Sequence, residues 1–230
     1  MLHKSYVGQL ASYLRFDSII NLAIPGSSLD LQVRFLFEFL QKNRARFNRI
    51  FVLWGLTSHL RWELYSNKIA TPVAFQIGAD VPPGAASFYH GRNAEMKSFL
   101  TNHWNEQFEL ERYNQKIVMT HAYLQMLDIP HLFFCTFESF NGHNMNLVHI
   151  NDDNFFKKKD NPNDMLSLWC HEHAICRPHV VSSAPFNKQD VSALGDLVSL
   201  GFLSQRYAHP TEKAHRDIAD RLKKFLETFY

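Results

Sequence analysis

Short apolar runs alternate with helix-like segments along the chain, and this alternation is the feature that most restricts the fold. The runs have the length and the β-branched or aromatic content of buried strands; they lie at Ser18–Ile24, Asn48–Trp54 and Ile129–Phe137. Apolar residues recur at helical spacing in four further segments, with one break expected in the third; these segments are Tyr6–Leu14, Ser28 or Leu29 to Lys42, Ala94–Leu127 and Pro210–Phe229. Because strands that alternate with helices form parallel sheets covered on both faces, we predict a three-layer α/β domain with a parallel sheet.

Two stretches interrupt this alternation. Ile77–Asn93 is rich in Gly, Pro and small residues, and Asn141–Asp164 is polar and contains a lysine triplet. We take each to follow a strand, so each can lie over the carboxyl edge of the sheet, where open α/β folds bind ligands. The alternative is a solvated loop without a ligand, which we favour for the second stretch.

Length, charge and cysteine content restrict the class of protein. A chain of 230 residues, 46% hydrophobic, fills one core, so we expect a single domain over residues 1–230. The formal net charge is +2 and the longest basic run is Lys157–Lys159, which argues against nucleic-acid binding. No apolar run reaches membrane-spanning length and no apolar leader follows Met1, so we expect no membrane insertion. Three cysteines do not make a disulfide framework, which favours a reducing, cytoplasmic location.

The first predicted strand stops abruptly at Pro25 and Gly26 in the sequence NLAIPGSS, and two serines precede the next helix. A junction between strand and helix is a common place for a nucleophile, so Ser27 and Ser28 are candidate catalytic residues. The sequence lacks, however, the flanking small residues of a G-x-S-x-G elbow. Helix capping is the alternative that we favour for both serines, because serine is a common N-cap residue.

Three motifs in register resemble the SGNH (GDSL-like) hydrolase family. They are NLAIPGSS, a second strand ending in WGLTS, and AHPTEKAH at the start of the last helix; LDIPHLFFCTF adds to the similarity, which runs from about Ser5 to the end of the chain. The resemblance implies a flavodoxin-like α/β fold. It also implies a serine hydrolase that needs no cofactor and acts on a small ester, an acylated sugar or a lipid.

The resemblance assigns roles to particular residues. Gly26 corresponds to the glycine whose backbone N–H faces the oxyanion, and Thr57 occupies the place of an auxiliary donor. His209 corresponds to the general base that precedes the last helix. The remaining positions of these motifs would contact the substrate; they are Ser58, Arg61 and Arg206.

The sequence also departs from the family at three places. The family's nucleophile lies in a Gly-Asp-Ser turn before the first helix, and this chain begins too late to include that turn. Thr57 stands where the family has the asparagine of Gly-x-Asn-Asp, and a hydroxyl has a shorter reach than an amide. Arg206 stands where the family has the triad acid, and a cation there disfavours a charged His209. The rival hypothesis is therefore a binding or structural protein that has kept the fold and lost the chemistry.

Two smaller features each have two interpretations. Cys170, His173 and Cys176 would share one helical face, and thiolate with imidazole suits zinc. The spacing is not that of a zinc knuckle, so we favour a buried structural cysteine and expect no metal. Arg61 and Glu63 either line the cleft or form an exposed ion pair, and we favour the ion pair.

The absence of the family's first strand has a structural consequence. In the order 2-1-3-4-5 that strand lies between Ser18–Ile24 and Asn48–Trp54, whose backbone groups would then lack partners. Three arrangements would supply partners: direct pairing of these two strands, insertion of another segment, or donation of a strand by a neighbouring chain. The third arrangement predicts a homo-oligomer.

Overall fold

The fold is known from a computed structural model. It describes residues 4–24, 27–57, 61–66, 71–76, 102–103, 105–136, 149–157, 164–175, 195–204 and 210–228. The helices are α1 (Tyr6–Tyr13), α2 (Leu29–Asn43), α4 (Glu106–Met126), α5 (Met165–Glu172) and α7 (Glu212–Leu226), with short 3-10 helices η2 (Arg44–Arg46) and η5 (Asp152–Asn154). The strands are β1 (Val52–Leu56), β2 (Arg61–Ser66), β3 (Thr71–Gln76) and β4 (His131–Cys135).

The chain is a mixed α/β protein with a small parallel sheet. In the described residues this sheet has two strands, β1 and β4, whose register runs from Val52 opposite His131 to Leu56 opposite Cys135. A parallel pair needs a crossover connection, and α4 lies between the two strands in the chain. A separate hairpin, β2 with β3, is antiparallel.

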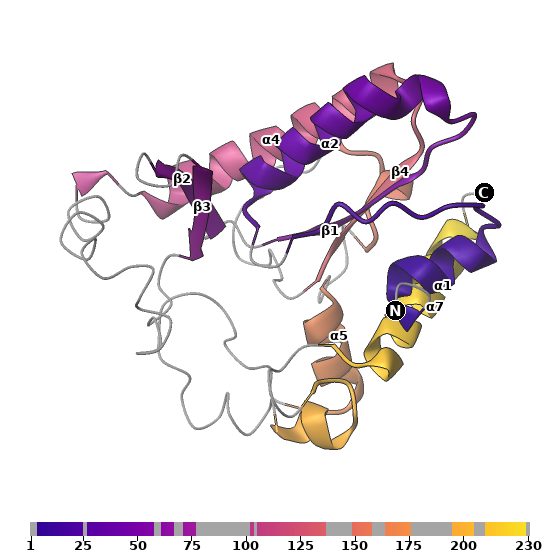
Figure 1. Ribbon diagram of the computed structural model, residues 1–230. Coiled ribbons are helices and arrows are strands. Elements are labelled where there is room, and N and C mark those ends of the chain that lie inside the picture. Colours follow the sequence, from indigo (N-terminus) through magenta and orange to yellow (C-terminus); the bar gives the residue numbers. More distant parts are fainter. Residues whose placement is uncertain are drawn as a thin grey trace.

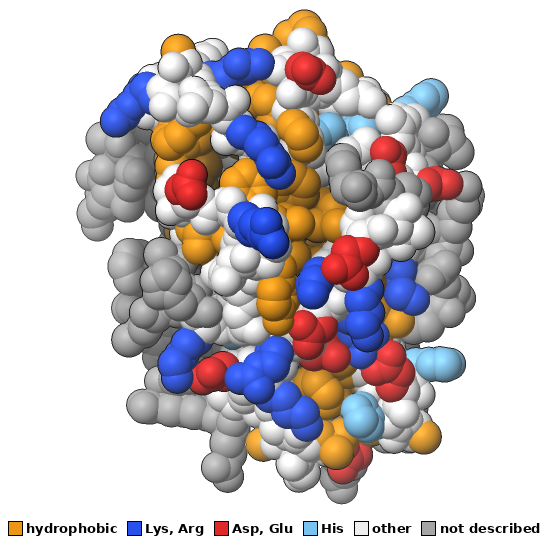
Figure 2. All heavy atoms as spheres, turned by 90° about the vertical axis from the view of Figure 1, so that its right-hand side faces the viewer, with side chains coloured by type: hydrophobic (Ala, Val, Ile, Leu, Met, Phe, Trp, Pro, Cys, Tyr) orange, Lys and Arg blue, Asp and Glu red, His pale blue; other side chains and the backbone are white. Residues whose placement is uncertain are grey.

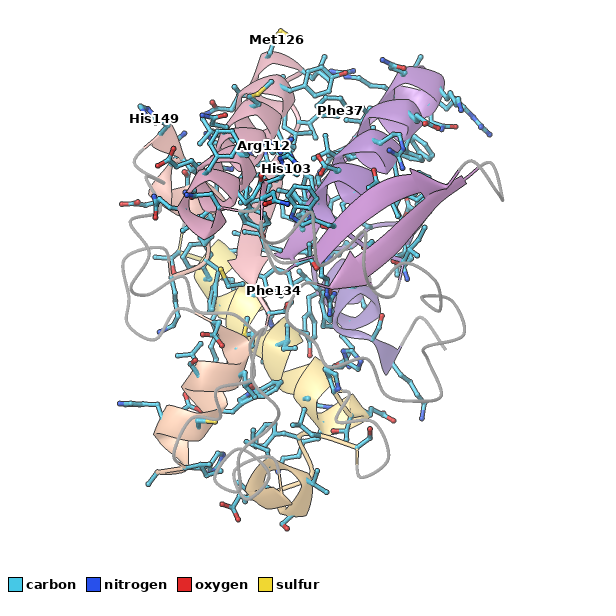
Figure 3. The ribbon with its side chains drawn as sticks, turned by 90° about the vertical axis from the view of Figure 1, so that its left-hand side faces the viewer. Phe37, His103, Arg112, Met126, Phe134 and His149 are labelled. Atoms are coloured by element: carbon cyan, nitrogen blue, oxygen red, sulfur yellow. The ribbon has the colours of Figure 1, made fainter. Side chains whose placement is uncertain are left out.

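Helices cover both faces of the parallel sheet (Figure 1). Phe133 and Cys135 of β4 are buried in a core that they share with α2 and α4, whereas Leu132 and Phe134 belong to a core with α1, α5 and α7. Side chains alternate across a strand, so one fully buried strand supplies both cores. In Figure 3 Phe134 lies in the middle of the molecule, between the α2–α4 layer and the helices below it.

Side-chain caps and charged contacts fix the helices. The capping side chains accept a hydrogen bond from a first-turn N–H; they are Ser5 for α1, Ser28 for α2, Asn105 for α4, Asp164 for α5 and Thr211 for α7. Arg221 of α7 donates two hydrogen bonds to Glu172 of α5, at 2.8 and 2.6 Å. The indole N–H of Trp169 on α5 reaches Asp217 of α7 at 2.7 Å, so charge and packing join these two helices.

Most of the predicted helices and two of the predicted strands are confirmed. Helices α1 and α7 fall within the predicted segments, α2 ends one residue beyond the predicted Lys42, at Asn43, and α4 occupies the second part of Ala94–Leu127. Residues 94–101 of that segment lie outside the described residues. Strand β4 is the central part of the run Ile129–Phe137, whereas β1 begins near the end of the run Asn48–Trp54 and continues to Leu56. Pro210 precedes the last helix instead of standing in its first turn, because Thr211 is the cap.

The predicted strand Ser18–Ile24 is wrong. These residues are extended but join no sheet among the described residues. Nor are they buried, because Ile20, Leu22 and Ile24 are 48%, 37% and 43% exposed. A strand depends on partners for its backbone groups, and the apolar content that led to the prediction cannot supply them.

The polar stretch Asn141–Asp164 is not simply a solvated loop. Phe155 and Phe156 are buried at 0% and 3% exposure, and Phe156 N donates to Phe133 O at 2.9 Å. Asp164 forms a parallel bridge with Cys135. This part of the stretch covers the edge of β4 that faces away from β1, so the preferred interpretation was wrong there. The other stretch, Ile77–Asn93, lies outside the described residues.

Candidate functional site

A group of polar side chains lies where β1 ends. Thr57 follows β1 directly, and its hydroxyl donates to the carbonyl oxygen of Ser27 at 3.2 Å. Arg61 Nη1 donates to the same hydroxyl oxygen at 3.0 Å, and the Tyr113 hydroxyl donates to the Thr57 carbonyl. The contact between Thr57 and Ser27 brings the turn before α2 to the carboxyl end of β1. We call Ser27, Thr57 and Arg61 the polar corner.

The Ser27 side chain is buried, with 3% of the residue exposed, and its oxygen already has a donor. Gln32 Nε2 donates to Ser27 Oγ at 3.0 Å, and Gln32 Oε1 accepts from the Trp54 indole at 2.6 Å. Among the described residues, no histidine or carboxylate is hydrogen-bonded to this hydroxyl. A nucleophilic serine needs such a base to take its proton.

Ser28 caps α2. It is fully buried, and its Oγ accepts from the N–H of Leu31 at 3.2 Å. The capping interpretation of Ser28 is therefore confirmed. Its oxygen points back into the first turn of the helix, so attack on a substrate would first require loss of the cap.

The Thr57 hydroxyl is also engaged. Its hydrogen is donated to Ser27 O and its oxygen accepts from Arg61, so it cannot face an oxyanion without giving up a bond. A guanidinium has five N–H donors, and Arg61 uses one of them at Thr57. Arg61 is therefore the group of the polar corner best able to hold an oxygen-bearing ligand.

Glu63 does not pair with Arg61. Arg34 of α2 donates two hydrogen bonds to its carboxylate, at 2.8 and 3.1 Å, and the Glu63 side chain is only 12% exposed. The interaction with Glu63 raises the pKa of Arg34. The preferred interpretation of Arg61 and Glu63 as an exposed ion pair was therefore wrong, and Arg61 remains available for the polar corner.

Four of the residues named from the sequence lie outside the described residues; they are Gly26, Ser58, Arg206 and His209. The structure brings together Thr57 and Ser27, the neighbour of Gly26. The roles of Gly26 as oxyanion donor and of His209 as general base stay predictions.

The alternative metal site divides between core and surface. Cys170 is 1% exposed and belongs to the core around α5 and α7, whereas His173 ends α5 on the surface with its ring 5.4 Å from that of Phe202. Cys176 lies outside the described residues. Within the described part of the chain, no three His, Cys, Asp or Glu side chains are grouped as metal ligands.

Sequence reasoning missed a buried pair of histidines. His131 Nδ1 donates to the carbonyl of Ile129 at 2.8 Å, which leaves His131 Nε2 to accept from His121 Nδ1 at 2.7 Å. Burial lowers the pKa of His131. One histidine is on α4 and the other begins β4, so no local spacing in the sequence signals their contact. Both are about 2% exposed, which makes them part of the core and excludes direct contact with a ligand.

Comparison with known proteins gives no relative: no protein-family model, no curated protein and no solved structure matches the chain. Among the helices of the described residues, none has the combination of length and apolar character required to cross a membrane.

Proposed function

We propose that the chain is a binding protein on an SGNH-type, flavodoxin-like α/β scaffold, and that it does not hydrolyse esters through Ser27 or Ser28. The observation that carries the proposal is that the hydroxyl groups of Ser27, Ser28 and Thr57 are already engaged in hydrogen bonds. Ser28 caps α2, Ser27 accepts from an amide, and Thr57 donates to a backbone carbonyl.

These hydrogen bonds work against nucleophilic catalysis. A serine attacks efficiently when a general base lies within hydrogen-bond reach of its hydroxyl. The amide of Gln32 donates to Ser27 and cannot take up its proton. Removing Ser28 from its cap would cost about 1 kcal/mol of helix stability, so attack by Ser28 would begin from a disfavoured state.

Arg61 gives the polar corner a preference for ligands that carry oxygen atoms. A guanidinium matches a carboxylate or an ester carbonyl through its planar array of donors. The ligand that fits is a small acyl compound, such as a carboxylic acid, an ester or an acylated carbohydrate. The low cysteine content supports a reducing, cytoplasmic location for this binding.

Ester hydrolysis is the second candidate function. The packing of Thr57 against the Ser27 turn favours it, because the resemblance implies that the Gly26 turn and the end of the second strand share one site. In this hypothesis His209 is the base, and the N–H of Gly26 together with Thr57 binds the oxyanion.

Hydrolysis and binding can be measured separately. The chain should cleave p-nitrophenyl acetate and p-nitrophenyl butyrate no faster than buffer, and ligand-observed NMR should detect binding of sodium butyrate. Arg61→Gln should abolish the NMR signal of binding, whereas Arg216→Gln, on the exposed face of α7, should leave it unchanged. Turnover that Ser27→Ala or Ser28→Ala abolishes would establish the hydrolase, and butyrate binding unaffected by Arg61→Gln would remove the polar corner as the binding site.

A further inference from the structure

A cavity runs along the free edge of β1, and we call it the β1 groove. Its volume is about 680 Å³, and its walls are residues 15–23 after α1 and residues 46–55 up to the end of β1. Leu36 and Phe39 of α2 also line it. Figure 2 looks onto the side of the molecule that carries the connection from α2 to β1, and it shows a band of hydrophobic side chains beside Lys and Arg side chains.

One wall of the β1 groove is an unpaired strand edge. Val52 N donates to Pro130 O at 3.0 Å, so the backbone groups of Val52 and Trp54 point toward β4. Backbone groups point alternately to the two sides of a strand, which directs the N–H and C=O of Leu53 and Gly55 to the opposite edge. That edge lines the groove, and no strand among the described residues pairs with it.

The other wall is the extended segment 18–24, which also lacks a strand partner in the described part of the chain. Its Ala23 N–H bonds only to the side chain of Asn21, at 3.0 Å. The N–H and C=O groups of Leu53 and Gly55 on the free edge of β1 present alternating donors and acceptors to whatever lies in the groove. A β-strand is the ligand whose own N–H and C=O groups match such a pattern, as in recognition by strand addition.

The lining of the groove specifies the composition of this strand. Leu10 of α1 and Leu36 of α2 both line the groove and belong to the cores on opposite faces of the sheet, so an inserted strand meets apolar surface on both of its faces. Strands in that situation are apolar throughout. β1 has five residues, and at about 3.3 Å per residue it offers roughly 17 Å of edge.

Charge at the groove specifies what flanks the strand. The lining includes three arginines and one acidic residue; these are Arg15, Arg46, Arg49 and Asp17. Arg49 lies over the ring of Phe16, with its guanidinium carbon 4.8 Å from the ring centre. The excess of cations favours a strand with acidic residues at one end.

We propose that the β1 groove binds a short, extended, apolar segment of another polypeptide, with acidic residues at one end, as an added β-strand. The only segment of this kind that is exposed in the described residues is 18–24, and it already forms a wall of its own groove. We assign the occupant to a different polypeptide, because the excess of arginines at the groove favours acidic residues beside the apolar strand. The assignment does not rest on the proposed function, because no residue of the polar corner lines the groove.

The test uses fluorescein-labelled EEVIVVI peptide and fluorescence anisotropy. Saturable binding is expected, and methylation of alternate backbone nitrogens should weaken it at least about tenfold, since two or more hydrogen bonds are lost. Arg46→Glu with Arg49→Glu should weaken binding at least about fivefold and strengthen binding of KKVIVVI. Both arginines are exposed, so the fold should be retained, and Arg216→Glu is the matched control on α7.

Three results would overturn the proposal. The first is the absence of saturable binding of EEVIVVI by the wild-type chain. The second is equal binding of the N-methylated peptide, which would mean that the backbone edge is not used. The third is a dimer, seen by light scattering, that Ile20→Lys dissociates; the occupant of the groove would then be a second copy.

Discussion

Replacing Gly55 with alanine should destabilise the protein although the change adds a single methyl group. A Cβ at this position would lie 3.0 Å from Phe134 Cζ and 3.0 Å from Thr136 Cγ2. Phe134 is fully buried on β4, so its ring cannot move aside into solvent (Figure 3). Overpacking of this kind costs about 1–3 kcal/mol, while replacing a strand glycine gains roughly 0.5–1 kcal/mol. The difference between the midpoints of these two ranges gives an expected net loss of about 1 kcal/mol.

Urea unfolding followed by tryptophan fluorescence measures this loss directly. In a thermal melt the same change should lower Tm by roughly 2–4 °C for a chain of this length. Gly195→Ala is the matched control, because a Cβ there would meet nothing within 4 Å. Phe134→Leu should restore part of the stability of Gly55→Ala in a double-mutant cycle. A Gly55→Ala protein as stable as wild type would refute the close packing between β1 and β4.

Three further changes probe the interior and the helix contacts. Ser28→Ala should lower the free energy of unfolding by about 1 kcal/mol, with Ser28→Thr keeping most of it, because the α2 cap is lost in the first variant and kept in the second. Burial lowers the pKa of His131, so the unfolded chain binds more protons and the free energy of unfolding should fall as the pH drops below about 6.5. Urea unfolding of His131→Gln at several pH values should therefore show a flatter pH dependence than wild type. An unchanged pH dependence would contradict the role given to His131. Arg221→Met should lower the free energy of unfolding by roughly 1–3 kcal/mol near neutral pH. Arg221 lowers the pKa of Glu172, so the difference in free energy of unfolding between this variant and wild type should shrink below about pH 4, where Glu172 becomes protonated.

The elements that sequence predicted well are those whose signal is local. Helix α7 repeats Ile218 and Leu222 along one face, and both are buried in the core as that spacing requires. Ser28 is a cap, as predicted, because the chain order of hydroxyl and first helical turn suffices to define a cap. Two apolar runs contribute to strands, the end of Asn48–Trp54 to β1 and the middle of Ile129–Phe137 to β4, since burial on both faces demands such runs.

The failures arose where long-range pairing decides the structure. Ser18–Ile24 has strand-like composition, but no partner strand in the described residues takes up its backbone groups. Phe155 and Phe156 lie in a polar stretch and are nevertheless buried, because the chain passes beside β4 there. At the polar corner the residue types were read from the sequence. Which group each hydroxyl contacts depends on the approach of α2 to the end of β1, and no sequence spacing encodes that approach.

The central claim is that Ser27 and Ser28 have structural roles and do not act as nucleophiles. Labelling the chain with a fluorophosphonate probe, followed by intact-mass and peptide mass spectrometry, tests it most directly, because this reagent modifies only a serine activated by a neighbouring base. The account predicts that both serines stay unmodified after prolonged incubation, with a serine hydrolase labelled in parallel as the positive control. Stoichiometric modification of Ser27 or Ser28 would contradict it.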